Sequence, residues 1–127
     1  MKKQLQKKVL IVDDEVETCR FIAGHFARYK NYKVYEAYDG AQAFDTIQKI
    51  VPHLIILDVI MPVMDGFQLL QRLKGHRRYS KIPVIILTAK SKPEDLGRGI
   101  DLKADFYLPK PLNLDNLISF ADLILEN

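Results

Sequence analysis

The sequence predicts a doubly wound parallel α/β sheet built from five consecutive strand–helix units. Short apolar runs rich in β-branched residues alternate along the chain with longer segments in which apolar residues recur every three or four positions. Three of the runs, at 9–12, 54–57 and 84–87, are continuously apolar, which is typical of strands that helices cover on both faces. Alternation of this kind gives parallel strands joined by right-handed crossovers.

The first two units occupy residues 8–52. The first predicted strand, Lys8–Val12, ends abruptly in an acidic run, and the helix after it has an apolar stripe formed by Val16, Cys19, Ile22, Ala23 and Phe26. The second strand is predicted at Tyr32–Ala37. Asp39-Gly40 makes the turn into a second helix that Pro52 closes. The apolar positions of that helix are Ala43, Phe44, Ile47 and Ile50.

The remaining three units follow the same pattern. The third predicted helix has apolar positions at Phe67, Leu69, Leu70 and Leu73. Pro93 opens a fourth helix, which Gly97 and Gly99 weaken by up to about 1 kcal/mol each relative to alanine. The other predicted elements are strands at Leu54–Leu57, Val84–Leu87 and Phe106–Leu108 and a last helix at Leu114–Leu125.

Length and composition are those of one ordinary globular domain. The chain has 127 residues, of which 48% are hydrophobic and 28% charged, so disordered and fibrous classes are excluded. Cys19 is the single cysteine, which excludes a disulfide framework. No apolar run is long enough to cross a membrane, and no secretory signal begins the chain, so we expect a cytoplasmic protein with no membrane partner.

The net charge of +3 has a local origin. Four lysines lie within the first eight residues, so the rest of the chain is close to neutral and we expect no direct binding of nucleic acid. We interpret residues 1–7 as a basic lead-in and 8–126 as the folded domain. A second basic segment, 74–81, is expected to complement the end of a helix and to stay in water.

Polar side chains follow four of the five predicted strands. Asp13 and Asp14 follow the first, Asp58 the third, Thr88 the fourth and Lys110, after a proline, the fifth. Ligands of an open α/β sheet bind at these carboxyl ends. Three close carboxylates repel one another unless a cation compensates, and an oxygen-only set favours Mg²⁺ over zinc. With a lysine and a hydroxyl beside it, such a site can accept a phosphoryl group on a carboxylate.

Each of these residues also has an ordinary structural role when taken alone. An acidic pair after a strand is often the N-cap of a helix, threonine is common at strand ends, and most lysines are surface residues. The functional interpretation depends on the four positions occurring together. None of His25, His53 and His76 belongs to a cluster, so none is a candidate ligand, and Cys19 is predicted to be a buried reduced thiol.

The chain resembles the receiver domain of bacterial two-component response regulators, of the chemotaxis-regulator kind. The matching stretches are VLIVDDE at 9–15, LIILDVIMPVMDG at 54–66, PVIILTA at 83–89 and ADFYLPKP at 104–111. The resemblance covers about residues 8–125, almost the whole chain, and these motifs in this order are highly specific. The resemblance implies a flavodoxin-like (βα)5 fold with strand order 2-1-3-4-5.

The resemblance also implies a role for each acidic residue. Asp58 corresponds to the phosphoacceptor, which takes a phosphoryl group from the phosphohistidine of a sensor histidine kinase or a phosphotransfer protein. Asp13, Asp14, Asp58 and the backbone carbonyl of Ile60 correspond to the Mg²⁺ ligands.

The other matching positions correspond to a switch. The resemblance implies that Thr88 and Lys110 bind the phosphoryl oxygens and that Tyr107 moves with Thr88. Partner binding through the face of the fourth helix, fifth strand and fifth helix would then change. Such a domain is a signalling switch that assists its own phosphorylation and slow dephosphorylation, and it acts on a downstream protein or domain as a monomer or a phosphorylation-dependent dimer. We expect either a stand-alone receiver or a piece of a longer regulator.

Two other classes use a similar sheet. A Mg²⁺-dependent phosphatase of the haloacid-dehalogenase type also forms an aspartyl phosphate, but it needs Asp-x-Asp after the first strand, where this chain has Asp13-Asp14-Glu15. A flavodoxin-like FMN carrier needs a phosphate-binding loop at that place, and two carboxylates would repel the phosphate.

Overall fold

A computed structural model of the chain describes residues 6–29, 31–58, 66–88, 105–109 and 113–125. The predicted fourth helix lies outside these ranges, so the labels pass from α3 to α5. None of the helices within them is long and apolar enough to cross a membrane. The elements are β1 (Lys7–Val12), α1 (Val16–Phe26), β2 (Tyr32–Ala37), α2 (Gly40–Ile50), β3 (Leu54–Asp58), α3 (Gly66–Lys74), β4 (Val84–Thr88), β5 (Phe106–Pro109) and α5 (Leu114–Leu125).

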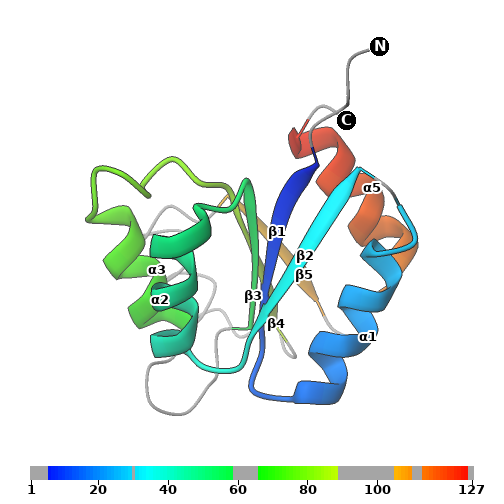
Figure 1. Cartoon of the computed structure of the whole chain (residues 1–127), viewed down its shortest axis with the longest axis horizontal. Coiled ribbons are helices and arrows are strands. Elements are labelled where there is room, and N and C mark those ends of the chain that lie inside the picture. Colours follow the sequence, from blue (N-terminus) through cyan, green and yellow to red (C-terminus); the bar gives the residue numbers. More distant parts are fainter. Residues whose placement is uncertain (1–5, 30, 59–65, 89–104, 110–112, 126–127) are drawn as a thin grey trace.

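The strands form one parallel sheet in the order β2-β1-β3-β4-β5. Helices α2 and α3 cover one face and α1 and α5 the other (Figure 1). This arrangement confirms the predicted doubly wound fold. It also confirms that the three continuously apolar strands, β1, β3 and β4, are the interior strands of the sheet.

Alternate residues of the interior strands enter two separate apolar layers. Leu10, Ile55 and Ile86 face α2 and α3, whereas Ile11, Ile56 and Ile85 face α1 and α5. Because both faces are covered, every described residue of β3 is buried. Burial of that many aliphatic side chains, at about 1.5–3 kcal/mol each when complete, makes the sheet a rigid platform for its carboxyl edge.

The ends of α2 show how local sequence sets a helix boundary. The Asp39 side chain accepts a hydrogen bond from Gln42 N at 2.7 Å, and Gln42 Oε1 accepts one from Tyr38 N at 3.1 Å. Asp39 is therefore the N-cap of α2, and Gln42 reaches back to the amide of the residue before the cap, one position further than in a capping box. At the other end Val51 adopts a left-handed φ of 45°, so the helix ends at Ile50, and Pro52 follows and closes it as predicted.

Strand boundaries differ slightly from the prediction. β1 begins at Lys7, one residue earlier than expected, because Lys7 pairs with the first residue of β2. Strands β3, β4 and β5 include Asp58, Thr88 and Pro109 respectively, which the sequence placed just beyond the strands. Their pairing continues through Asp58 with Leu87 and Thr88 with Pro109, so the polar edge of the sheet remains regular backbone.

The expectation that residues 74–81 stay in water is wrong for Lys74. Only 17% of the Lys74 side chain is exposed. Its ammonium donates to the carbonyls of Ser80 at 3.0 Å and Ile82 at 3.3 Å, and it lies 3.8 Å from a carboxylate oxygen of Asp105. The lysine therefore ties the loop after α3 to the segment that leads into β5.

Candidate metal centre

The pairing of β1 with β3 brings two distant aspartates together. Val12 pairs with Leu57 in the parallel register, so the next residues along the two strands, Asp13 and Asp58, lie side by side at the carboxyl edge. Asp14 follows Asp13 at the same edge. The sheet order therefore creates the acidic cluster.

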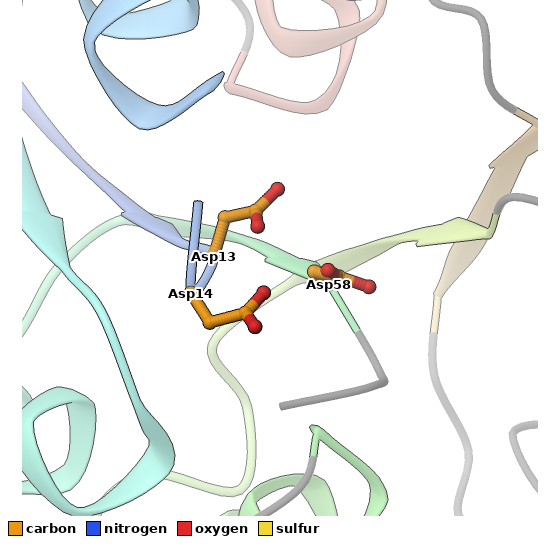
Figure 2. Close-up of side chains that lie close together, drawn as sticks. All are labelled: Asp13, Asp14 and Asp58. Atoms are coloured by element: carbon orange, nitrogen blue, oxygen red, sulfur yellow. The ribbon is translucent and has the colours of Figure 1, made fainter. Parts of the chain in front are cut away.

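Three carboxylates meet at this edge. Each of Asp13, Asp14 and Asp58 offers one oxygen, and these oxygens all lie within 4.8 Å of one another. Asp13 is fully buried and Asp58 is 8% exposed, whereas Asp14 is exposed to solvent. Figure 2 shows the three side chains gathered where β1 and β3 end. The cluster thus has a buried floor and one open side.

Backbone contacts fix Asp13 in place. Its N–H donates to the carbonyl of Ala37 at 3.1 Å, and its Oδ1 accepts a hydrogen bond from Glu15 N at 3.0 Å. Glu15, not either aspartate, is the N-cap residue of α1, and its side chain makes no capping hydrogen bond. Neither aspartate is therefore the N-cap of α1, although Asp13 accepts a hydrogen bond from the amide of the N-cap residue.

Cys19 lies directly behind the acidic cluster. The thiol Sγ donates to the Asp13 carbonyl at 3.4 Å, and its other acceptors are the carbonyls of Ala37 and Ile11 at 3.7 and 3.8 Å. Burial, with the nearby charges of Asp13 and Glu36, raises the pKa of Cys19 to about 12. The thiol stays protonated at neutral pH, and the structure confirms a buried reduced cysteine.

The contact between Cys19 and Asp13 was not predicted. The apolar stripe of α1 placed Cys19 in the core, but the stripe does not show which strand end it meets. The available signal was spacing: a residue in the second turn of the helix that follows β1 packs back onto the end of that strand.

Tyr38 flanks the same edge and was also not singled out by the sequence. It follows the last residue of β2, and its hydroxyl donates to Glu36 Oε1 at 3.2 Å. Partial burial, together with the Glu36 carboxylate, raises the pKa of Tyr38. The phenol therefore remains neutral beside Glu36.

The structure places the other predicted site residues only in part. Thr88 ends β4 and pairs with Pro109 at the end of β5, so its backbone belongs to the edge that holds the acids. The side chains of Thr88 and Tyr107, and the whole of Ile60 and Lys110, lie outside the described part of the molecule. Their roles stay predictions.

The donor set fits a hard divalent cation. All the ligand atoms that the cluster offers are carboxylate oxygens. A cation at this place would relieve the mutual repulsion of three carboxylates and would complete its shell with water through the open side at Asp14. Mg²⁺ prefers oxygen ligands and retains several waters, so the residues fit this ion.

Comparison with known proteins identifies the family to which the sequence is similar. The sequence model described as "Response regulator receiver domain" matches residues 9–122. Response regulator GtcR of Aneurinibacillus migulanus is 41% identical over 109 residues, which cover 86% of this chain and 43% of that protein. The gliding motility regulatory protein of Myxococcus xanthus is 43% identical over 103 residues, 81% of this chain and 13% of that protein. The chain spans less than half the length of these curated relatives.

Solved structures show the same architecture over nearly the whole chain. The chemotaxis protein CheY4 of Vibrio cholerae superposes with a TM-score of 0.87 and 32% identity, over 94% of this chain and 99% of that chain. The receiver domain of a histidine kinase from Syntrophus aciditrophicus gives the same score and identity, over 94% and 90% of the two chains.

Proposed function

Because the chain belongs to the response regulator receiver domain family of two-component systems, we propose that it is a signalling switch phosphorylated on Asp58. The observation that carries this proposal is the cluster of three carboxylates, with Asp58 at the end of an interior strand between the acids of β1 and the end of β4. A carboxylate held there is a nucleophile with a cation site beside it. The donor is the phosphohistidine of a sensor histidine kinase or a phosphotransfer protein.

The transfer exchanges one bond for another. A carboxylate oxygen of Asp58 supplies the electron pair for a new P–O bond, while the P–N bond of the phosphohistidine breaks and its electrons return to the imidazole nitrogen. Asp13, Asp14, Asp58 and the carbonyl of Ile60 would hold Mg²⁺, which would supply positive charge to the phosphoryl oxygens. The hydrogen bond from Glu15 N to Asp13 Oδ1 orients one of these carboxylates.

The output of the switch is a change in partner binding. We assign Thr88 and Lys110 to the phosphoryl oxygens, since a charge-assisted hydrogen bond there is worth about 1.5–3 kcal/mol and exists only after phosphorylation. Tyr107 then follows Thr88 and alters the face formed by the predicted fourth helix, β5 and α5. A downstream protein or domain reads this face, and the protein acts in the cytoplasm as a monomer or a phosphorylation-dependent dimer.

Phosphorylation by acetyl phosphate tests the proposal. In the presence of Mg²⁺ the parent protein should gain a single phosphoryl group by intact mass, and Asp58→Asn should gain none because the nucleophilic oxygen is replaced by an amide. Asp45→Asn, which removes an exposed aspartate from α2, is the matched control and should be labelled like the parent. Equal labelling of Asp58→Asn and the parent would contradict the assignment. Steady hydrolysis of p-nitrophenyl phosphate would favour the phosphatase alternative.

A further inference from the structure

Four exposed cations gather at the end of the sheet opposite the acidic cluster. Arg72 is in the last turn of α3, and Arg77, Arg78 and Lys81 belong to the loop that leads to β4. This loop precedes the first residue of β4, so it lies at the amino edge, whereas Asp58 ends β3 at the carboxyl edge (Figure 1). We call these four residues the α3–β4 basic patch.

Two buried rings order the arginines. The Arg72 guanidinium lies 4.1 Å from the centre of the Phe44 ring, and the Arg78 guanidinium lies 5.8 Å from that of Tyr79. The rings pack edge to face, with centres 6.1 Å apart. Contact with an aromatic face restricts each guanidinium while leaving its N–H groups open to solvent. The rings thus connect the helix end to the loop.

The loop itself is firmly held. Tyr79 is only 3% exposed and Ile82 only 8%, so both anchor the loop in the core. The amides of Tyr79 and Ser80 donate to the His76 carbonyl at 3.0 and 2.9 Å, and Lys74 donates to the carbonyl of Ser80. Side chains on a fixed backbone lose less conformational entropy when a ligand binds.

Within the described part of the chain, no carboxylate pairs with the cations of the patch. The carbonyls at the end of α3 do not need these cations as hydrogen-bond donors, because Gln71 and Leu73 already accept from the amides of Gly75 and His76. Among the described residues, the ion pairs are His25–Asp115, Lys49–Asp45 and Lys74–Asp105, and none includes a member of the patch. The patch therefore offers its positive charge to a ligand.

We propose that the α3–β4 basic patch binds a carboxylate-rich segment of a protein partner. Three of its four cations are arginines, whose planar forks pair bidentately with carboxylates. Because the patch lies at the edge opposite Asp58, this binding is independent of phosphorylation. It would tether the protein to a partner in both states of the switch, and it does not depend on the function proposed above.

Two features favour an acidic peptide over other polyanions. Binding of single-stranded nucleic acid uses exposed rings for base stacking, but the rings against which the arginines lie, Phe44 and Tyr79, are buried. The exposed His76 ring already lies against Tyr79, with ring centres 4.5 Å apart. Membrane binding uses apolar side chains beside the cations. The exposed large apolar side chains among the described residues lie on other elements and are Val16, Phe21, Tyr29 and Leu123.

Fluorescence anisotropy with a labelled peptide of consecutive glutamates tests this inference. The parent should bind, with an affinity that falls as salt is raised from about 50 mM to about 200 mM. Arg77→Glu/Arg78→Glu should weaken binding about tenfold, the equivalent of losing several exposed charge interactions. The matched control, Arg28→Glu/Lys33→Glu, changes the net charge equally at exposed positions elsewhere and should bind like the parent.

Each other outcome overturns the inference. Equal weakening in both double variants would show attraction to net charge alone. Tighter binding of a single-stranded RNA, or of phosphatidylserine vesicles, than of the peptide would assign the patch to nucleic acid or membrane. Folding of each variant is checked by circular dichroism, and Arg77→Gln is a milder variant that should give a smaller loss. Beryllofluoride with Mg²⁺ should leave peptide affinity unchanged, even if Asp58 proves not to be the phosphoacceptor.

Discussion

Replacing Asp14 with asparagine should stabilise the protein without Mg²⁺ and destabilise it, relative to the parent, with Mg²⁺. The three carboxylate oxygens lie within 4.8 Å of one another. Two unit charges at that separation repel by about 3.5 kcal/mol in an effective dielectric of about 20. Because Asp14 is exposed, water screens most of this repulsion. We expect Asp14→Asn to raise the free energy of unfolding by about 1 kcal/mol in EDTA.

Mg²⁺ should reverse that order. At a concentration about ten times the dissociation constant of the parent, binding to the folded state adds about 1.4 kcal/mol to its stability. Asp14→Asn loses a charged ligand from the open side of the cluster, so its affinity falls and it gains little. The stability curves of the two proteins should cross as Mg²⁺ is titrated.

Urea unfolding followed by circular dichroism, in EDTA and at several Mg²⁺ concentrations, measures this crossing. Glu17→Gln is the matched control, since it removes one exposed carboxylate from the first turn of α1. Its response to Mg²⁺ should equal that of the parent. The reasoning fails if Asp14→Asn is less stable than the parent in EDTA, or if Mg²⁺ stabilises both equally.

Three further results are expected. Gly24→Ala should raise the free energy of unfolding, measured by urea unfolding, by about 0.5–1 kcal/mol. Gly24 is an exposed residue of α1 with open space where the Cβ of alanine would lie, so a decrease would contradict this reasoning. Partial burial and neighbouring lysines lower the pKa of His53, whose Nδ1 accepts from Lys8 N at 2.9 Å. The folded state therefore favours neutral His53, and the free energy of unfolding should fall as the pH drops below about 6.5. The loss should be at most the value of one hydrogen bond, about 0.5–1.5 kcal/mol. His53→Gln should flatten this part of the pH–stability profile, and an unchanged profile would show that other groups cause the fall. Thr88→Ala should still be phosphorylated by acetyl phosphate but should lose most of the NMR change around Tyr107 on adding beryllofluoride, and a full response would break the proposed coupling.

The predictable part of the fold came from patterns that act over short distances. Continuous apolar runs identified β1, β3 and β4, because strands buried on both faces are apolar at every position. Periodicity identified the described helices, because a helix buried on one face has apolar residues every three or four positions. Pro52 and the Asp39-Gly40 turn marked the ends of α2 correctly, since both act through the local backbone.

The site was predicted less completely. The acids at the strand ends could be named, because parallel strands share one carboxyl edge. The roles of Cys19 and Tyr38 beside that edge could not, since they depend on how α1 packs and how β2 ends. Lys74 was assigned to solvent for the same reason: its partner Asp105 is remote in the chain and meets it only through the pairing of β4 with β5.

The sequence by itself determined the fold class, the apolar interior strands and the chemical types of the residues at their ends. Tertiary structure alone decided that β1 pairs with β3 in a register that sets Asp13 beside Asp58, with one carboxylate fully buried and Asp14 open to water. Local propensity acts within a few residues, whereas the closeness of three like charges is imposed by burial of the whole sheet between its helices. That burial supplies the free energy that holds the carboxylates together.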